Sequence, residues 1–356
     1  MFNIFFKSLR NRKGTALLTI FSISIIVTLL IGVENIRKGV RKSFSSAVSG
    51  TDIIVGARGG SLQLLLYSIF RIGNAPNNIS WESYNELRNN KRVKWTIPIS
   101  LGDSHRGFRV VGTNKDYFNY FRYGSKKKLK FLEGGPFSEV FDAVIGSEIA
   151  KHFKYKLNQK IIIAHGTGKK SFLNHDDKPF KIVGILQTTG TPVDQSLQVR
   201  LEGITAMHID WDSGAPPMEE ERISAEEAME LDLTPEEITS FLIGMKSKIH
   251  AFDFQRQINT FKKEPLSAIM PGVALQELWN ILRTAETGLR VITWFVLFAG
   301  LLGMITALLS GLNERRREMA ILRSVGAGPG TISFLLIMEA FILTLSGIIF
   351  GLFFYT

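Results

Sequence analysis

The 356-residue sequence contains no cysteine, and this absence excludes several kinds of chemistry at once. A chain without thiols forms no disulfide, offers no thiolate to a zinc ion and has no cysteine nucleophile. The lack of cysteine does not identify the cellular compartment, because disulfide-free domains are found both in the cytosol and in the bacterial periplasm.

Acidic side chains are also few, with 32 Asp and Glu against 43 Lys and Arg, which leaves a net charge of +11. Much of the positive charge borders long apolar runs: Lys7, Arg10, Arg12 and Lys13 before the first, and Arg315, Arg316, Arg317 and Arg323 after the second. Basic residues beside apolar runs are typical of membrane segments. We therefore expect membrane lipid, and no nucleic acid, as the partner of this charge.

A complete phosphate-binding loop is missing as well. The segment HGTGKKS (165–171) resembles the end of such a loop, but Ile163 stands where its first glycine belongs, and a second lysine separates Lys169 from Ser171. A proline-containing stretch follows, whereas a P-loop needs a helix N-terminus that aims N–H groups at phosphate. We expect no cofactor and no ATP hydrolysis on this chain.

Catalytic and metal-binding motifs are likewise weak. Ser104-His105 lies in a turn-like GDSHRG, without a GxSxG motif or an orienting acid. His165, His175, Asp176 and Asp177 carry potential metal ligands, but their spacing matches no strong metal motif, and we interpret this polar loop as solvated. The sequence thus predicts neither a catalytic residue nor a bound metal.

Three apolar runs are long enough to cross a bilayer core, which takes about 20 helical residues. They cover residues 15–33, 291–312 and 331–356. The competing interpretation of the first run is a cleaved signal peptide, whose apolar core would be shorter. Mean hydropathy is only slightly positive, as expected for a few spans joined to a large soluble part.

Helical patterns continue beyond the first two runs. Ile36, Val40, Phe44 and Val48 recur every four residues and predict a stalk over residues 34–50. The alternative is a basic helix that lies flat on the membrane. A similar apolar stripe over residues 273–290 predicts a second stalk that leads into the second span.

Residues 51–272 contain no run of spanning length and predict a large α+β domain of two subdomains. Ile97–Leu101 and Phe108–Val111 predict a hairpin around GDSHRG. Ser224–Glu227 and Thr234–Glu237 both fit capping boxes, which predict two short helices. We expect the second subdomain to be inserted at about residues 210–264.

Charge predicts the topology. Residues 313–330 carry more Arg than Glu, so this loop and the basic N-terminus, residues 1–14, should be cytoplasmic. The large domain is then extracytoplasmic. Within the loop, Met319, Leu322 and Gly326 share one face of an amphipathic helix, which suits either a headgroup anchor or a docking surface. Glu339, inside the third span, should face other helices and find a partner there.

The segment NERRREMAILRSVGA, between the second and third spans, resembles the signature of FtsX/MacB-type permeases, the membrane subunits of type VII ABC transporters. VIGSEIAKHF, KPFKIVGIL and TGTPVDQSLQV resemble stretches of the MacB-type periplasmic domain, so the resemblance covers nearly the whole chain. It implies an inner-membrane protein whose α-helical spans and long stalks carry a large extracytoplasmic α+β domain. The family has four spans and this chain has three, so we expect a fragment that ends before the fourth.

By this resemblance, the segment 314–327 is a coupling helix that docks on a separate ABC ATPase. The residues that match the family pattern best are Glu314, Glu318, Ala320, Leu322, Arg323, Gly326 and Ala327. The resemblance also implies a homodimer or heterodimer of permeases and a periplasmic adaptor or substrate protein as a further partner.

We therefore expect a permease subunit that transmits the ATP-driven motion of a separate ATPase to the periplasmic domain, for export or for work on the cell envelope. The alternative is a membrane-anchored regulator of a cell-envelope hydrolase or of a signalling partner, as FtsX is. In both cases the chain itself is not an enzyme.

Overall fold

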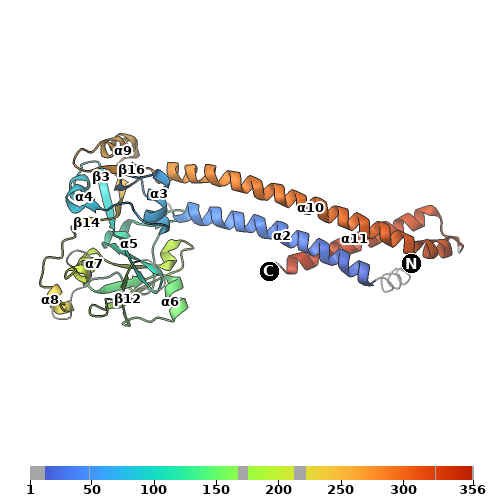
Figure 1. The fold of residues 1–356 in the computed structure, drawn as a ribbon, viewed down its shortest axis with the longest axis horizontal. Helices are drawn as coiled ribbons and strands as arrows, with labels where there is room; N and C mark the ends of the chain where they lie inside the picture. Colours follow the sequence, from blue (N-terminus) through green and yellow to red (C-terminus); the bar gives the residue numbers. More distant parts are fainter. Residues whose placement is uncertain (1–12, 48, 167–174, 212–221, 325, 355–356) are drawn as a thin grey trace. The chain divides into compact units, whose positions relative to one another are not determined.

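The fold is that of a computed structural model, which describes residues 13–47, 49–166, 175–211, 222–324 and 326–354 (Figure 1). The chain divides into two compact units. The helical unit contains the residues up to Val40 and those from Ile281 onward, and the sheet domain covers Arg41–Asn280. Among the described residues, 3 helices are long and apolar enough to cross a membrane. The predicted fold class, membrane-spanning helices with a large domain of helices and strands, is confirmed.

The helical unit is built from three long helices: α2 (Lys13–Ala47), α10 (Pro271–Ser324) and α11 (Pro329–Phe353). The 54 residues of α10 form one uninterrupted helix. We expected residues 313–330 to be a loop that contains a separate helix, but α10 continues through Ser324. Residues 314–323 are rich in Glu, Arg, Met, Ala and Leu, which favour a helix, and the chain turns only at Gly326, where φ is +92°.

Small residues let the three helices approach closely. A Cβ atom on Gly300 of α10 would lie 2.0 Å from Ile26 of α2, and one on Gly347 of α11 would lie 2.7 Å from Ile23. The Thr28 hydroxyl donates to the Gly351 carbonyl at 3.0 Å. In lipid, apolar helices gain nothing from hiding apolar surface from water, so they associate through close packing of their backbones. Glycine at a crossing permits that close packing. These contacts make α11 parallel to α2.

The first sheet of the sheet domain is antiparallel, in the order β16 (Leu266–Ile269), β1 (Ile53–Ala57), β15 (Ser240–Met245) and β3 (Val93–Ile99). Every residue of β1 is buried, because both faces of the sheet are covered. Ile53 and Val55 pack with Phe254 and other residues of α4 (Trp81–Arg88) and α9 (Ala251–Asn259). Ile54 packs on the opposite face with Leu64 of α3 (Ser61–Leu65).

The second sheet is mixed. Its path is β10 (Lys160–Ile161), β12 (Phe180–Leu186), β9 (Asp142–Ile145), β13 (Ser196–Arg200), β5 (Phe108–Thr113), β4 (Asp103–His105) and β11 (Ala164–His165), with β8 (Phe131–Gly134) also on β12. The pairs β12–β9 and β13–β5 are parallel. Ile149 of α6 (Ser147–Phe153) and Met207 of α7 (Leu201–His208) belong to its core with Ile145 and Val199.

Short elements complete the sheet domain. Two small ladders pair β2 (Ile79–Ser80) with β14 (Glu237–Ile238) and β6 (Arg122–Tyr123) with β7 (Lys127–Lys128). The remaining helices and helical turns are α5 (Asp116–Tyr120), α8 (Ala225–Ala228), η1 (Leu66–Phe70), η2 (Pro192–Gln195) and η5 (Lys248–His250).

The predicted insertion at residues 210–264 is wrong. Strand β15 lies in that range, yet it pairs with β1 on one side and β3 on the other, in the centre of the first sheet. The inserted part is instead the second sheet, whose strands lie between β3 and β15 in the chain. The change of composition at residues 213–217 marks a loop, but hydrogen bonding between distant strands decides which segments share a subdomain.

Two local predictions also differ from the structure. The hairpin around GDSHRG joins β5 to β4, while β3 pairs with β15. The first capping box is present at Ser224 and Glu227 of α8. The second is absent from the described residues, because the backbone N–H and hydroxyl of Thr234 donate to Asp232 at 2.9 and 2.7 Å, and Glu237 lies in β14. An Asp two residues before a Thr offers a turn that competes with a helix.

We predict that Gly146→Ala destabilises the sheet domain by about 1–3 kcal/mol, the usual cost of overpacking. A Cβ atom at this position would lie 2.3 Å from the backbone oxygens of Val193 and Asp194, and the Gly146 N–H bonds to Ser196 at 3.0 Å. The free energy of unfolding is measured by denaturant titration. Gly102→Ala is the control, because a Cβ there meets nothing within 4 Å. Equal losses in the two variants would contradict the close approach.

In the helical unit, Gly347→Val should lower the melting temperature in detergent, through a loss of about 1–3 kcal/mol from steric overlap with Ile23. Gly303→Val is the matched control, since it places the same β-branched side chain in a membrane helix where nothing lies within 4 Å. If both variants melt alike, the crossing of α11 and α2 is not set by this glycine.

Candidate functional site

The predicted docking segment forms the last turns of α10 and the connection to α11. Of the seven predicted residues, Glu314, Glu318, Ala320, Leu322 and Arg323 belong to α10, while Gly326 and Ala327 follow it. The side chains of Glu314, Glu318 and Leu322 lie outside the described part of the structure. Ala320, Arg323 and Gly326 are exposed and Ala327 is half-buried. Ile321 beside them is 63% exposed, so an apolar side chain and a cation are both accessible here.

An ion-pair cluster joins α2 and α10 elsewhere in the helical unit. The Arg37 guanidinium donates to the Glu34 carboxylate at 2.8 Å and lies 3.6 Å from Glu286 of α10. Lys38 approaches the same Glu34 carboxylate at 3.3 Å. Arg37 thus contacts two carboxylates, one on each helix, and links α2 to α10.

Glu339, the carboxylate expected to face other helices, lies in α11 and is half-buried. Burial next to neighbouring groups is what an ionisable residue in a membrane helix requires. Its role in coupling stays a prediction.

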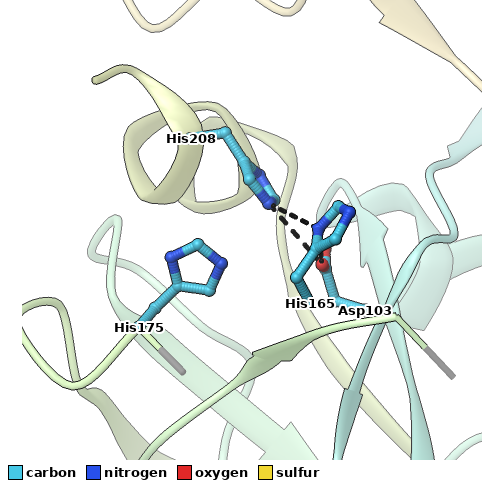
Figure 2. A group of neighbouring side chains, drawn as sticks. All are labelled: Asp103, His165, His175 and His208. Atoms are coloured by element: carbon cyan, nitrogen blue, oxygen red, sulfur yellow. Dashed lines mark hydrogen bonds and ion pairs between the residues drawn. The ribbon is translucent and has the colours of Figure 1, made fainter. Parts of the chain in front are cut away.

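A second group of polar side chains lies in the sheet domain, where Asp103, His165, His175 and His208 face one another (Figure 2). Each offers one ligand atom, and these atoms lie within 4.8 Å of one another. The β4–β11 ladder places Asp103 directly opposite His165. His208 ends α7, and the His175 backbone N–H bonds to the Ile163 carbonyl at 3.0 Å.

The distances within this cluster are short. Nδ1 of His165 lies 3.2 Å from the Asp103 carboxylate, and Nε2 of His208 lies 3.6 Å from the same oxygen. The two imidazole nitrogens are 3.3 Å apart. The Trp211 ring covers the group, with its centre 4.7 Å from His175 and 5.2 Å from His165.

The burial of His175 corrects the interpretation of this polar segment as solvated throughout. His175 is only 2% exposed, and its Nε2 has no hydrogen-bond partner among the described residues. Asp176 does point to solvent, at 64% exposure, and Asp177 pairs with the buried Lys178 at 3.0 Å. The segment 167–174, which includes most of the P-loop-like stretch, lies outside the described residues.

Burial and charge move the pKa values of these histidines in opposite directions. The neighbouring Asp103 carboxylate raises the pKa of His165, because it favours the protonated ring. Burial, followed by the neighbouring His208, lowers the pKa of His175 to about 4. At neutral pH His175 is therefore a neutral imidazole with a free lone pair on one nitrogen.

Ser104 and His105, the other polar pair singled out in the sequence, are structural. The Ser104 hydroxyl donates to the Gly166 carbonyl at 2.6 Å. The His105 ring bonds to the Ile162 carbonyl at 2.6 Å and to the Tyr155 hydroxyl at 2.8 Å. Both ring nitrogens of His105 are therefore occupied by partners that cannot act as an orienting acid.

Asp103, His208 and Trp211 were missed as site residues, because they are far from His165 and His175 in the sequence. The fragment MHIDWD around His208 carries only a weak signal, a histidine and a tryptophan at the end of an apolar helix. The pairing of β4 with β11 and the packing of α7 bring these residues close to His165 and His175. The spacing of residues within a short sequence segment predicts neither of these tertiary contacts.

Comparison with known protein families gives two matches. Residues 16–224 match the model of the MacB-like periplasmic core domain, and residues 290–356 match the FtsX-like permease C-terminal domain. The first match alone covers more than half of the chain. Both agree with the resemblance seen in the coupling segment and in the sheet domain.

Individual proteins are similar at a lower level. An uncharacterized ABC transporter permease of Methanocaldococcus jannaschii is 21% identical over 371 residues, which cover 98% of this chain and 80% of that protein. The periplasmic region of MacB from Actinobacillus actinomycetemcomitans has a TM-score of 0.39 at 11% identity, covering 68% of this chain and 98% of that one. The extracellular domain of YknZ from Gram-positive bacteria has a TM-score of 0.36 at 13% identity, covering 61% and 98%.

We predict that Arg37→Gln lowers the melting temperature of the helical unit, because it removes the ion pairs to Glu34 and Glu286. Thermal unfolding in detergent measures the change. Lys38→Gln is the control, because Lys38 contacts the same Glu34 but is 68% exposed, against 28% for Arg37. Adding Glu286→Gln to Arg37→Gln should destabilise the protein little further, because the ion pair is already broken. If the losses from the two single substitutions add in full, no bridge joins α2 and α10 at this point.

Proposed function

The chain belongs to the MacB/FtsX-type ABC transporter permeases, and on that premise we propose that it transmits the motion of a separate ATPase to its sheet domain. In this proposal the chain hydrolyses no ATP. It forms a dimer with a second permease, and the dimer binds two ATPase subunits. The sheet domain acts outside the membrane, on a substrate or on a partner protein.

The observation that carries the proposal is the continuity of α10. Near its start, Ala274 and Leu278 are buried, and Ala274 belongs to a core of the sheet domain. Trp279 packs edge-on against Phe44 at 6.0 Å, and the Ser61 hydroxyl donates to Glu277 at 2.5 Å. The same helix contains the predicted docking residues near its end. At 1.5 Å per residue, a helix of 54 residues is about 80 Å long, and in this proposal it carries the motion from the docking residues toward the sheet domain.

The end of α10 has the features that a docking surface needs. Ile321 and Arg323 are exposed, and the left-handed turn at Gly326 ends the helix abruptly before α11 begins at Pro329. An exposed apolar side chain beside an arginine suits a protein groove and a layer of lipid headgroups alike. The family match is what favours docking over a helix that rests among lipid headgroups.

The proposed topology places the N-terminus and the α10–α11 connection in the cytoplasm. Helix α10 runs antiparallel to α2, since Glu286 approaches Arg37 and Gly300 approaches Ile26. The chain therefore leaves and re-enters the helical unit on one side, as an extracytoplasmic domain between two spans requires. The basic residues around positions 315–323 then lie on the cytoplasmic side.

We expect Arg323→Glu, alone or with Leu322→Glu, to weaken association with the partner ABC ATPase by at least about tenfold, as for a hot spot at an interface. Co-purification in detergent and stimulation of ATP hydrolysis are the two measurements. Arg283→Glu is the matched control, because it reverses the charge of another exposed arginine on α10, far from the docking segment.

The outcomes separate docking from lipid binding. Loss of association in the Arg323 variant, with normal association in the Arg283 variant, supports the docking surface. Unchanged association, with loss of binding to anionic vesicles instead, would show that the segment is a headgroup anchor and would overturn the proposal.

A further inference from the structure

We propose that Asp103, His165, His175 and His208 form a binding site for a divalent transition-metal ion, with Zn²⁺ as the ion that the geometry suits best. All four residues belong to the sheet domain, and none of them belongs to the docking segment. It does not depend on the proposed transport function.

The spacing of the ligand atoms carries the proposal. Ligands bound to a tetrahedral zinc ion at about 2.0–2.1 Å lie about 3.4 Å from one another. The Asp103 oxygen, Nδ1 of His165 and Nε2 of His208 form a triangle with sides of 3.2, 3.3 and 3.6 Å. Three atoms from separate segments are thus already placed as one face of such a tetrahedron.

His175 supplies the fourth ligand. Its Nε2 has no hydrogen-bond partner among the described residues, and the residue is only 2% exposed, so water does not replace that partner. Figure 2 shows its ring turned toward the other three side chains. A buried ring nitrogen without a partner is costly in a metal-free protein, and a metal ion would satisfy it.

Hydrogen bonding outside the site orients one of the ligands. Nδ1 of His208 lies 3.0 Å from the Ile204 carbonyl in the preceding turn of α7, to which it donates. That bond leaves the lone pair on Nε2, the nitrogen that faces Asp103 and His165. A metal-binding histidine characteristically donates its other ring N–H in this way.

The ligand types select the ion. Imidazole suits Zn²⁺, Cu²⁺ and Ni²⁺, whereas Mg²⁺ and Ca²⁺ prefer sites made of oxygen atoms. Four protein ligands fill a tetrahedral shell and leave no open position, so the site is structural rather than catalytic. The ion would tie the β4–β11 ladder, the segment at His175 and the end of α7 to one another.

The competing explanation is a metal-free cluster held by hydrogen bonds. In that cluster the Asp103 oxygen lies 3.2 and 3.6 Å from nitrogens of His165 and His208, which are 3.3 Å apart, yet this oxygen and Nε2 of His175 both lack a hydrogen-bond partner among the described residues. Metal binding accounts for all four groups and is therefore the better explanation.

The test uses the full chain in detergent, purified with a tag that contains no histidine and stripped with a chelator that is then removed. Titration with ZnCl₂ by calorimetry should show one ion per chain and a rise in the melting temperature, while MgCl₂ should give neither. Co²⁺ should give the visible absorption of a tetrahedral site.

Two variants give the matched comparison. His208→Gln removes one ligand, whereas His250→Gln removes an exposed imidazole elsewhere in the sheet domain. Zinc affinity should fall by more than about tenfold in the first variant, since even an outer-shell change costs that much, and stay unchanged in the second. Asp103→Asn, which keeps the shape of the side chain, serves as a second test if His208→Gln does not unfold cooperatively.

The opposite results would overturn the site. If the stripped wild-type chain binds no Zn²⁺, or if Zn²⁺ stabilises the wild type, the Asp103 variant and the His250 variant equally, the four side chains form a metal-free cluster. These outcomes leave the docking proposal untouched, because ATPase association is measured separately.

Discussion

A bilayer provides no hydrogen-bonding partner for a peptide group, and this constraint underlies the helical unit. A helix meets it with bonds inside the segment itself, so α2, α10 and α11 form wherever the chain is apolar for long enough. Nothing in the physics ends such a helix at the membrane surface. Helix α10 therefore extends from Pro271 to Ser324, until glycine permits a left-handed turn at Gly326. The proposed transmission of motion depends on this unbroken bonding.

The sheet domain obeys the same need for backbone partners in another way. Its first sheet draws β1, β3, β15 and β16 from positions widely separated in the chain, and its second sheet lies between β3 and β15 in sequence. Both faces of β1 are covered, which explains why IIVGA shows no alternation. The ladder between β4 and β11 places Asp103 opposite His165, so two ligands of the proposed metal site depend on the register of these strands.

Much of the architecture could be predicted from local patterns. Long apolar runs with a helical period identified the spans, and the segment NERRREMAILRSVGA indicated the family to which the chain belongs. The capping box at Ser224 was also predicted correctly, because it depends on neighbouring residues. Predictions failed where the outcome depended on distant partners, as for the insertion at 210–264 and the hairpin that assigned β3 to the wrong sheet.

The sequence by itself determined the membrane helices, the exposed charge at the end of α10 and the absence of thiol chemistry, since composition and period suffice for these. Only the tertiary structure decided which strands are neighbours and which histidines meet. His165 and His175 looked like residues of a solvated loop until the packing of α7 brought His208 and Trp211 over them. The reason is physical: periodicity reports the face a residue occupies, whereas a site is made by the faces of several elements that come together in space.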